Sequence, residues 1–133
     1  MLFRSLVLVS FENDLDSLHL ALRHPLWFKH LHHAAPQAVL RHQRWTHADG
    51  DLEWRLLEGD FRARKYEAPA PDVVFYDPFS FRTDSDLWTL SAFRELADLC
   101  AERHTELFTY TNSTQVRAAM LAAGLHEIGR AHV

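Results

Sequence analysis

The sequence is poor in cysteine and glycine, and it has no long apolar run. Its single cysteine, Cys100, excludes an internal disulfide framework and fits a reducing compartment. No apolar stretch approaches the ~20 residues that a membrane-spanning helix needs. The formal net charge of −4 excludes a global basic field of the kind that attracts nucleic acid or an anionic membrane. These absences predict a soluble, cytoplasmic chain with one domain and no membrane partner.

What the chain does have is a series of short apolar runs, and 47% hydrophobic residues are enough for a core. Apolar runs predict strands, and apolar residues three and four positions apart predict helices. The order strand, helix, strand, strand, helix, strand, helix predicts an α/β fold with a mostly parallel sheet. The predicted strands cover 6–11, 52–57, 73–76 and 106–110. The predicted helices cover 16–24, two short helices within 26–44 separated at Pro36, 88–103, and 113–123 capped by Asn112.

The stretch 72–80, DVVFYDPFS, organises the rest of the chain. Its four apolar residues predict a strand that is buried on both faces. Pro78 ends the strand, so Asp77 stands at the carboxyl end, where open α/β sheets bind ligands. A carboxylate accepts N–H bonds, and the ring of Phe79 can pack on an amine or its cationic form. The pattern indicates a site that handles an amine, and a strand followed by a plain turn is the alternative.

Three acids, Glu12, Asp60 and Asp77, each follow a predicted strand. Parallel strands would bring all three to one edge of the sheet. There Glu12 can accept hydrogen bonds from both hydroxyls of a ribose. Asp60 can accept a hydrogen bond from an adenine amino group, and Phe61 can stack on the adenine ring. The alternative is three solvated loop acids.

Several motifs occur in the order of a known family and together cover nearly the whole chain. They are Ser10-Phe11-Glu12-Asn13, Gly59-Asp60-Phe61, Phe75-Tyr76-Asp77-Pro78-Phe79-Ser80, Leu87-Trp88-Thr89, Thr109-Tyr110 and Val116-Arg117. On these motifs the chain resembles the catalytic domain of the MnmC-like tRNA methyltransferases, which use S-adenosylmethionine. The resemblance implies a Rossmann-like sheet and the conversion of 5-aminomethyl-2-thiouridine, at the wobble position of tRNA, to its 5-methylaminomethyl form.

The resemblance also implies residue roles. Glu12 would bind the cofactor ribose, Asp60 would lie near the adenine, and Asp77 would position or deprotonate the substrate amine. The implied cofactor-binding residues are Glu12, Asn13, Asp60 and Phe61; the catalytic residues are Asp77, Pro78 and Phe79; the substrate-binding residues are Ser80, Arg82, Trp88 and Arg94. The family further implies a pathway partner, an FAD-dependent oxidase, and the sequence leaves open whether it is fused or separate.

One family feature is missing: a first strand followed by a Gly-rich turn and a helix. None of the four glycines precedes the strand that ends at Glu12. We therefore expect residues 1–127 to be a partial methyltransferase domain that also lacks its C-terminal hairpin. Such a domain would expose an unpaired strand edge or apolar surface, bind cofactor weakly and be inactive alone. Residues 128–133 match a translated sequencing adapter, and we expect them to be a non-native tail.

Several other patterns in the sequence have simpler explanations. The histidines at 30, 32, 33, 42 and 47 match no tight zinc spacing, so no metal is expected. Ser80 lacks the Gly-x-Ser-x-Gly frame of a hydrolase. The basic cluster Arg62, Arg64 and Lys65 is expected to be a solvated loop rather than a tRNA contact, and Trp27, Trp54 and Cys100 are expected in the core. A non-catalytic nucleotide- or partner-binding α/β module remains the alternative function.

Overall fold

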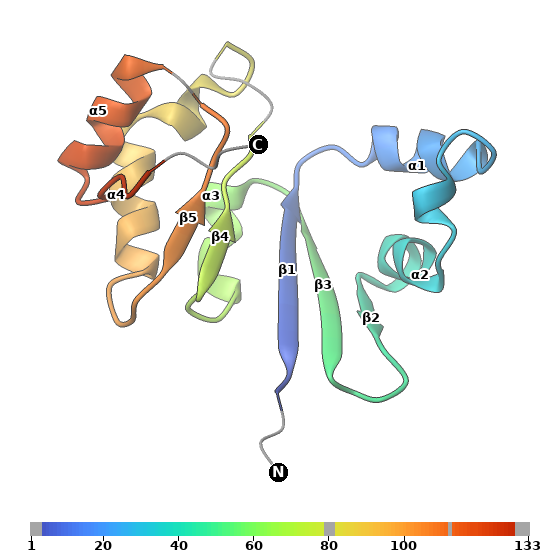
Figure 1. Ribbon diagram of the computed structural model, residues 1–133. Coiled ribbons are helices and arrows are strands. Elements are labelled where there is room, and N and C mark those ends of the chain that lie inside the picture. Colours follow the sequence, from blue (N-terminus) through green and yellow to red (C-terminus); the bar gives the residue numbers. More distant parts are fainter. Residues whose placement is uncertain (1–3, 79–81, 112, 130–133) are drawn as a thin grey trace. The chain divides into compact units, whose positions relative to one another are not determined.

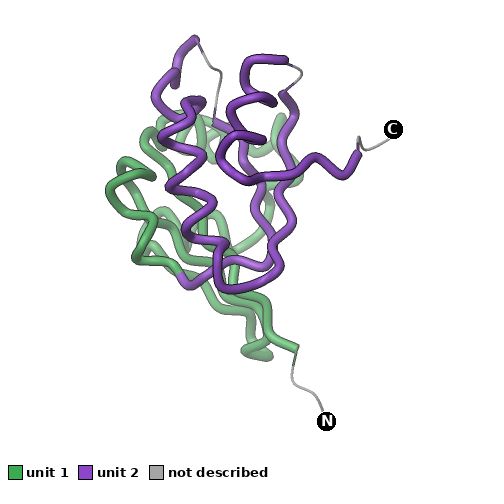
Figure 2. Tube along the Cα trace, turned by 90° about the vertical axis from the view of Figure 1, so that its left-hand side faces the viewer, with its two compact units in different colours: residues 1–68 green, residues 69–133 purple. Residues whose placement is uncertain are grey.

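The computed structural model describes residues 4–78, 82–111 and 113–129. The chain forms two compact units, residues 1–68 and 69–133, and each is described by itself (Figure 2). Phe79, Ser80, Asn112 and residues 130–133 of the expected tail lie outside the described residues. In the described part of the chain, no helix is long and apolar enough to cross a membrane.

The first unit is built around a three-stranded sheet in the order β1-β3-β2 (Figure 1). β1 and β3 are parallel, and β2 is antiparallel to β3. The strands are β1 Leu6–Glu12, β2 Arg44–Thr46 and β3 Leu52–Glu58. The helices are α1 Asp16–Arg23, α2 Ala34–His42 and α3 Phe61–Arg64, with 3-10 turns η1 Lys29–Leu31 and η2 Lys65–Glu67.

Helix α2 differs from the prediction because Pro36 does not interrupt it. Pro36 stands in the first turn, where a backbone N–H has no partner within the helix and its absence therefore costs nothing. His33 begins the helix, since its Nδ1 accepts a hydrogen bond from the Ala35 N–H at 3.1 Å. Gln43, with φ of 58°, ends it in the left-handed region and leads directly into β2.

The tryptophans of the first unit do not all lie where their spacing suggested. Trp54 is half-buried, and its Nε1–H donates to the Ser10 hydroxyl of the neighbouring strand at 3.0 Å. Trp27 is 84% exposed, so its expected place in the core was wrong. It stands in the turn between α1 and η1, where the chain leaves the helical periodicity on which the prediction rested. Val39 and Leu56 are the most deeply buried residues of this unit.

The second unit joins a pair of parallel strands to two helices. The elements are β4 Val73–Phe75, the 3-10 turn η3 Ser85–Trp88, α4 Leu90–Leu99, β5 Glu106–Phe108 and α5 Thr114–Ala122. Thr89 caps α4 through its Oγ1, and Ser113 caps α5 in place of the predicted Asn112. The core consists of Tyr76, Trp88, Ala92, Phe93, Leu96 and Val116. The predicted α/β class with parallel strands is confirmed.

The strands β1 and β4 are less buried than their apolar sequences indicated. β1 is an edge strand of its sheet, and Leu6 is 63% exposed. In β4, Val73 is 49% and Phe75 76% exposed, so the prediction that this strand is buried on both faces was wrong. The reason is that β4 hydrogen-bonds to β5 alone, and only Val74 of the strand is turned inward.

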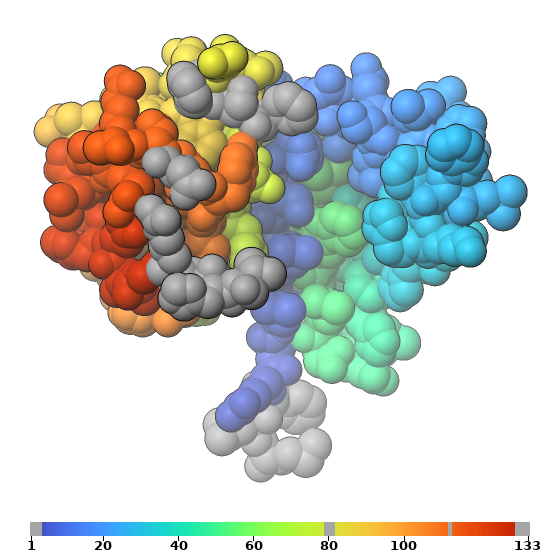
Figure 3. Space-filling view, turned by 45° about the horizontal axis from the view of Figure 1, so that its top comes forward, coloured from blue at the N-terminus to red at the C-terminus, as the bar shows by residue number. Residues whose placement is uncertain are grey.

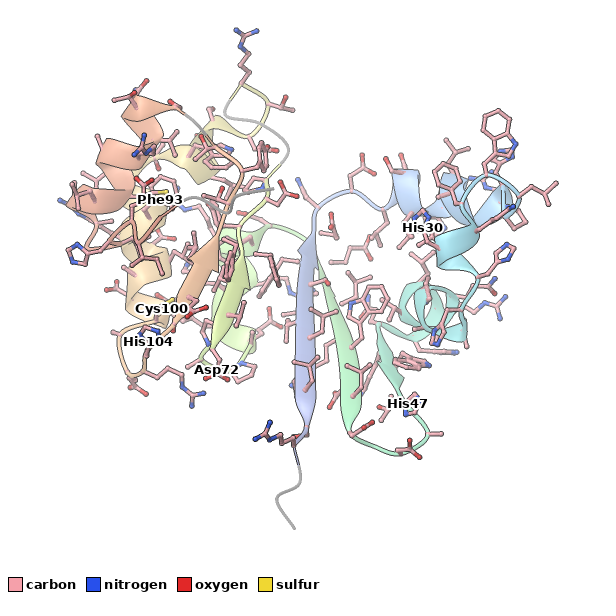
Figure 4. All side chains as sticks on the ribbon, in the orientation of Figure 1. His30, His47, Asp72, Phe93, Cys100 and His104 are labelled. Carbon is pink, nitrogen blue, oxygen red and sulfur yellow. The ribbon has the colours of Figure 1, made fainter. Side chains whose placement is uncertain are left out.

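Phe93 anchors the core of the second unit, and its truncation tests that role. The ring is fully buried and contacts those of Tyr76 and Trp88 at centroid distances of 5.7 and 6.3 Å (Figure 4). We expect Phe93→Ala to lower the free energy of unfolding by about 3–5 kcal/mol, because it leaves a cavity. Phe75→Ala, on an exposed ring of the same unit, should cost under about 1 kcal/mol. Equal losses in urea titrations would contradict this core.

Candidate functional site

The carboxyl ends of β1 and β3 form one edge of the first unit's sheet. In the parallel register Glu12 lies opposite Glu58, and the Gly59 N–H donates to the Glu12 carbonyl at 2.8 Å. Gly59 has φ of 130°, a conformation that disfavours any residue with a side chain. This turn brings Asp60 to the edge where Glu12 ends its strand. Parallel pairing thus places two of the three predicted acids together.

A cavity of about 250 Å³ opens beside this edge. Hydroxyls and carboxylates form one part of its wall and apolar side chains the rest. The lining residues are Ser10, Glu12, Asp14, Leu15, Ser17, Leu18, Val39, Trp54 and Leu56. A wall of this kind suits a ligand with several hydroxyl groups on a compact ring, because oxygen acceptors can orient the hydroxyls while the apolar part excludes water.

Among the acids that line this cavity, Glu12 has a shifted pKa. Partial burial raises the pKa of its carboxyl above the ordinary value, and the charge of Asp14 raises the pKa further. The carboxyl makes no hydrogen bond or ion pair within the described residues. The side chain is exposed, so its carboxylate oxygens are open to the hydrogen-bond donors of a ligand. A carboxylate can accept from both hydroxyls of a ribose, so the residues present are of the kind that can hold the nucleoside part of S-adenosylmethionine.

Asp60 and Phe61 have structural duties as well. The Asp60 Oδ1 accepts a hydrogen bond from the Arg62 N–H at 3.0 Å and so caps α3. The ring of Phe61 meets that of Phe11 edge to face, with centroids 5.0 Å apart. A carboxylate has a second oxygen, so Asp60 can still accept from a ligand amino group. The position of both residues agrees with the prediction, and their role in binding stays a prediction.

Sequence reasoning named Asn13 but missed other residues at this cavity. Asn13 is exposed in the bend after β1 and does not line the cavity. Ser10, Asp14 and Ser17 do line it. Ser10 was recognisable, because residues two apart on a strand point to the same face and Ser10 precedes Glu12 by two. Asp14 and Ser17 depend on how the chain turns into α1, and no short motif encodes that turn.

The second unit holds Asp77 at the carboxyl end of β4, as predicted from the sequence. The strand ladder extends through Tyr76, whose N–H donates to the Phe108 carbonyl at 2.8 Å. The Tyr110 hydroxyl donates to the Pro78 carbonyl at 2.9 Å, which anchors the backbone next to Asp77. Asp77 itself is exposed, so its carboxylate is open to a ligand.

Trp88 packs against the aromatic rings that flank Asp77 and Pro78. Its ring contacts those of Tyr76 and Tyr110 at centroid distances of 5.5 and 6.2 Å, and the Tyr76 hydroxyl donates to the Leu87 carbonyl. Trp88 is only 7% exposed, and its Nε1–H has no partner among the described residues. It thus belongs to the core of the second unit and supports the backbone next to Asp77. The other predicted substrate residues, Arg82 and Arg94, are exposed.

The remaining candidates have structural explanations. Lys65 is 6% exposed and donates to the Arg62 carbonyl, while Arg64 pairs with Glu67 at 2.6 Å. The expected solvated loop was therefore wrong, because α3 and η2 fold these cations back onto the chain. Burial raises the pKa of the half-buried Cys100 thiol, which disfavours a nucleophile. Among the described residues, the group with metal-ligating atoms close together is His47, Asp49 and Asp51, all partly or fully exposed.

The raised pKa of Glu12 predicts how stability depends on pH. Because the folded carboxyl holds its proton more tightly than the unfolded one, ionisation of Glu12 destabilises the fold. Stability is lost as the pH rises from the ordinary carboxyl pKa through the raised value. We expect Glu12→Gln to melt at a higher temperature than the parent chain at pH 7 and at nearly the same temperature at pH 4. A difference of equal size at both pH values would contradict the assignment.

Comparison with known proteins shows to which family the chain belongs. A family model described as S-adenosyl-L-methionine-dependent methyltransferase matches residues 24–133, which include Asp60, Asp77 and Trp88 but not Glu12. The chain is also 35% identical over 83 residues to the tRNA 5-methylaminomethyl-2-thiouridine biosynthesis bifunctional protein MnmC of Pseudomonas putida (strain GB-1). That match covers 62% of this chain and 12% of the relative. The chain therefore belongs to the S-adenosyl-L-methionine-dependent methyltransferase family.

Proposed function

We propose that the chain carries the methyl-transfer site of a tRNA-modifying enzyme. Its substrate would be the aminomethyl group of 5-aminomethyl-2-thiouridine at the wobble position, and its product the 5-methylaminomethyl form. Family membership supports the cofactor, and the name of the Pseudomonas putida relative supports the nucleoside. The observation that carries the proposal is the Glu12 carboxyl, which lines the cavity at the carboxyl end of β1, has a raised pKa and makes no hydrogen bond or ion pair within the described residues.

We assign cofactor binding to the first unit. Glu12 would accept hydrogen bonds from the ribose hydroxyls, with Asn13 beside it at the end of β1. Asp60 would accept from the adenine amino group through its second oxygen, and Phe61 would pack on the ring. When bound, S-adenosylmethionine supplies a methyl group on a positively charged sulfur. Carboxylates at the edge also favour that positive charge.

We assign binding of the substrate amine to the second unit, where Asp77 would position the amine and take its proton. Asp77 would hold the nitrogen in its neutral form and orient it, while bound S-adenosylmethionine would supply the methyl group for an in-line displacement in which the electron pair of the broken carbon–sulfur bond goes to sulfur. The proton leaves the nitrogen for Asp77 or solvent. Such a displacement depends mainly on orientation, so the anchored backbone at Pro78 matters more than an activated group. We propose that Phe79 and Trp88 bound the pocket, and that Ser80, Arg82 and Arg94 contact the nucleic acid.

The matched segment is a small part of the relative, so the rest of the pathway is also proposed. An FAD-dependent oxidase, fused or separate, would act in the same pathway. The chain would bind its tRNA in the cytoplasm. We propose that the 133-residue chain by itself binds cofactor weakly and has low activity. A non-catalytic nucleotide- or partner-binding module is the alternative, with the same cavity at β1 but no methyl transfer.

Two substitutions separate binding from chemistry. Glu12→Gln should weaken S-adenosylmethionine binding by about 10- to 100-fold, because a hydrogen bond to a charged acceptor contributes about 1.5–3 kcal/mol. Asp77→Asn should leave cofactor binding unchanged and slow methyl transfer by at least about 100-fold, the usual effect of losing a general base. NMR titration with millimolar cofactor detects weak binding, and transfer of a labelled methyl group to tRNA measures activity.

Glu58→Gln is the matched control, because Glu58 lies opposite Glu12 in the register but does not line the cavity. It should bind cofactor like the parent chain. If Glu12→Gln also bound like the parent chain, the cofactor site would be elsewhere. If cofactor bound normally and no amine on tRNA were methylated, the non-catalytic module would be the better account.

A further inference from the structure

The distribution of charge along the chain is uneven in a way that the methyl-transfer site does not use. Residues 17–48 contain none of the 18 acidic residues. We call this stretch the acid-free segment. Its cations are Arg23, Lys29, Arg41 and Arg44. It also holds seven of the chain's ten histidines, namely His19, His24, His30, His32, His33, His42 and His47. The chain as a whole has a net charge of −4, so this stretch is a local exception.

The elements of the acid-free segment follow one another along the chain within the first unit. The segment comprises most of α1, then η1, α2 and β2, all in the first unit (Figure 1). Side chains from α1, η1 and α2 enclose a cavity of about 410 Å³, among them Ala21, Phe28, Leu31, His32 and Gln37. Figure 3 shows α1 and the following turn in blue and cyan on one exposed face. His30 lies in that turn and His47 at the end of β2 (Figure 4).

Two cations of this surface have no ion-pair partner within the described structure. Lys29 and Arg41 are exposed and make no ion pair with any described acid. Arg44 contacts Glu53 at 2.8 Å, but the same carboxylate oxygen also binds Arg55 at 2.6 Å. One carboxylate between two guanidinium groups leaves a net positive charge. Lys29 and Arg41 are therefore the cations of the segment that stay available to an anion.

Two of the imidazoles have a defined orientation. The Nδ1 of His33 accepts from the Ala35 N–H at 3.1 Å, and the Nδ1 of His47 accepts from the Asp49 N–H at 3.3 Å. An accepting Nδ1 carries no proton in the neutral ring, so Nε2–H is the donor of His33. The Nδ1 of His47 also lies 3.5 and 3.4 Å from carboxylate oxygens of Asp49 and Asp51. The two rings flank Trp45, with centroid distances of 5.2 and 5.9 Å. This row offers N–H donors alongside an aromatic ring.

An exposed tryptophan completes the surface. Trp27 is 84% and the adjacent Leu26 79% exposed, in the turn whose Pro25 and Phe28 line the cavity. An indole this exposed loses the benefit of burial, and residues of this kind mark interaction sites. Flat aromatic rings among cations and N–H donors are the combination that binds unpaired nucleotides, because phosphates meet the charges and bases stack on the rings.

We propose that the acid-free segment is an RNA-binding surface, which grips the phosphate backbone of the tRNA through Lys29 and Arg41 and stacks an unpaired base on Trp27. The inference rests on the proposed function, because it takes its partner from there. It adds that docking of the RNA occurs on the first unit, away from Asp77 in the sequence. A chain with net negative charge needs such a local cationic surface to hold a polyanion.

The test measures the affinity of the full chain for unfractionated tRNA by fluorescence anisotropy at several salt concentrations. Lys29→Glu and Arg41→Glu should each weaken binding by at least about fivefold, and each should reduce the slope of log K against log salt by about 1. Arg4→Glu is the control, because it changes the net charge equally in the same unit but outside the segment. It should change the affinity by less than about twofold.

Trp27→Ala tests the stacking part. Because the side chain is 84% exposed, the variant should unfold at the parent temperature. It should bind tRNA about fivefold or more weakly, since stacking of a base on an aromatic ring contributes about 1–3 kcal/mol. Tyr66→Ala, which removes a 69% exposed ring elsewhere in the first unit, should bind like the parent chain.

Failure of this inference and failure of the proposed function give different results. If both charge reversals bound tRNA like Arg4→Glu, the proposal would be overturned, even if the same variants lost affinity for anionic vesicles or another protein. Absence of any salt-dependent tRNA binding by the parent chain would overturn it too. Cofactor binding and its loss in Glu12→Gln are measured separately by NMR. The results can therefore support the cofactor site and contradict the RNA-binding surface, or support the RNA-binding surface and contradict the cofactor site.

Discussion

The parallel pairing of β1 with β3 is the constraint on which the candidate cofactor site depends. Parallel strands end at the same edge, and the hydrogen bond from the Gly59 N–H to the Glu12 carbonyl closes that edge at 2.8 Å. Gly59 can make the bond because it has no side chain to oppose a φ of 130°. Glu12, which lines the cavity, and Asp60, which follows Gly59, thus stand at the same edge of the sheet. Without the shared edge they would be two unrelated loop acids.

The first unit also shows how one chain can hold opposite charges apart. Its acids gather at the strand ends and at the turn between β2 and β3, while the acid-free segment carries cations, imidazoles and an exposed indole. A cofactor with a positively charged sulfur and a polyanionic nucleic acid require opposite environments. Separation of the two along the fold permits both in a chain of net charge −4.

The sequence predicted well what depends on local pattern. The apolar runs located β1, β3, β4 and β5, and the acids after three of them gave Glu12, Asp60 and Asp77. It failed where tertiary context decides. The three residues of β2 are too few for a pattern, and Lys65 is buried only because α3 and η2 turn back. Trp27 is exposed because the short helix predicted around it is a turn followed by η1. The positions of the cavity residues Asp14 and Ser17 are set by how the chain turns from β1 into α1, which no short sequence motif encodes.

The most direct test of the central claim is to titrate the Glu12 carboxyl by NMR, in a chain with carbon-labelled glutamate, with and without S-adenosylmethionine. Burial and Asp14 now raise the pKa of this carboxyl. Hydroxyl donors from a bound ribose favour the ionised form, so the account predicts that the cofactor lowers the pKa of Glu12 while leaving the Glu58 titration unchanged. An unchanged or higher Glu12 pKa in the bound state would contradict a ribose site at the end of β1.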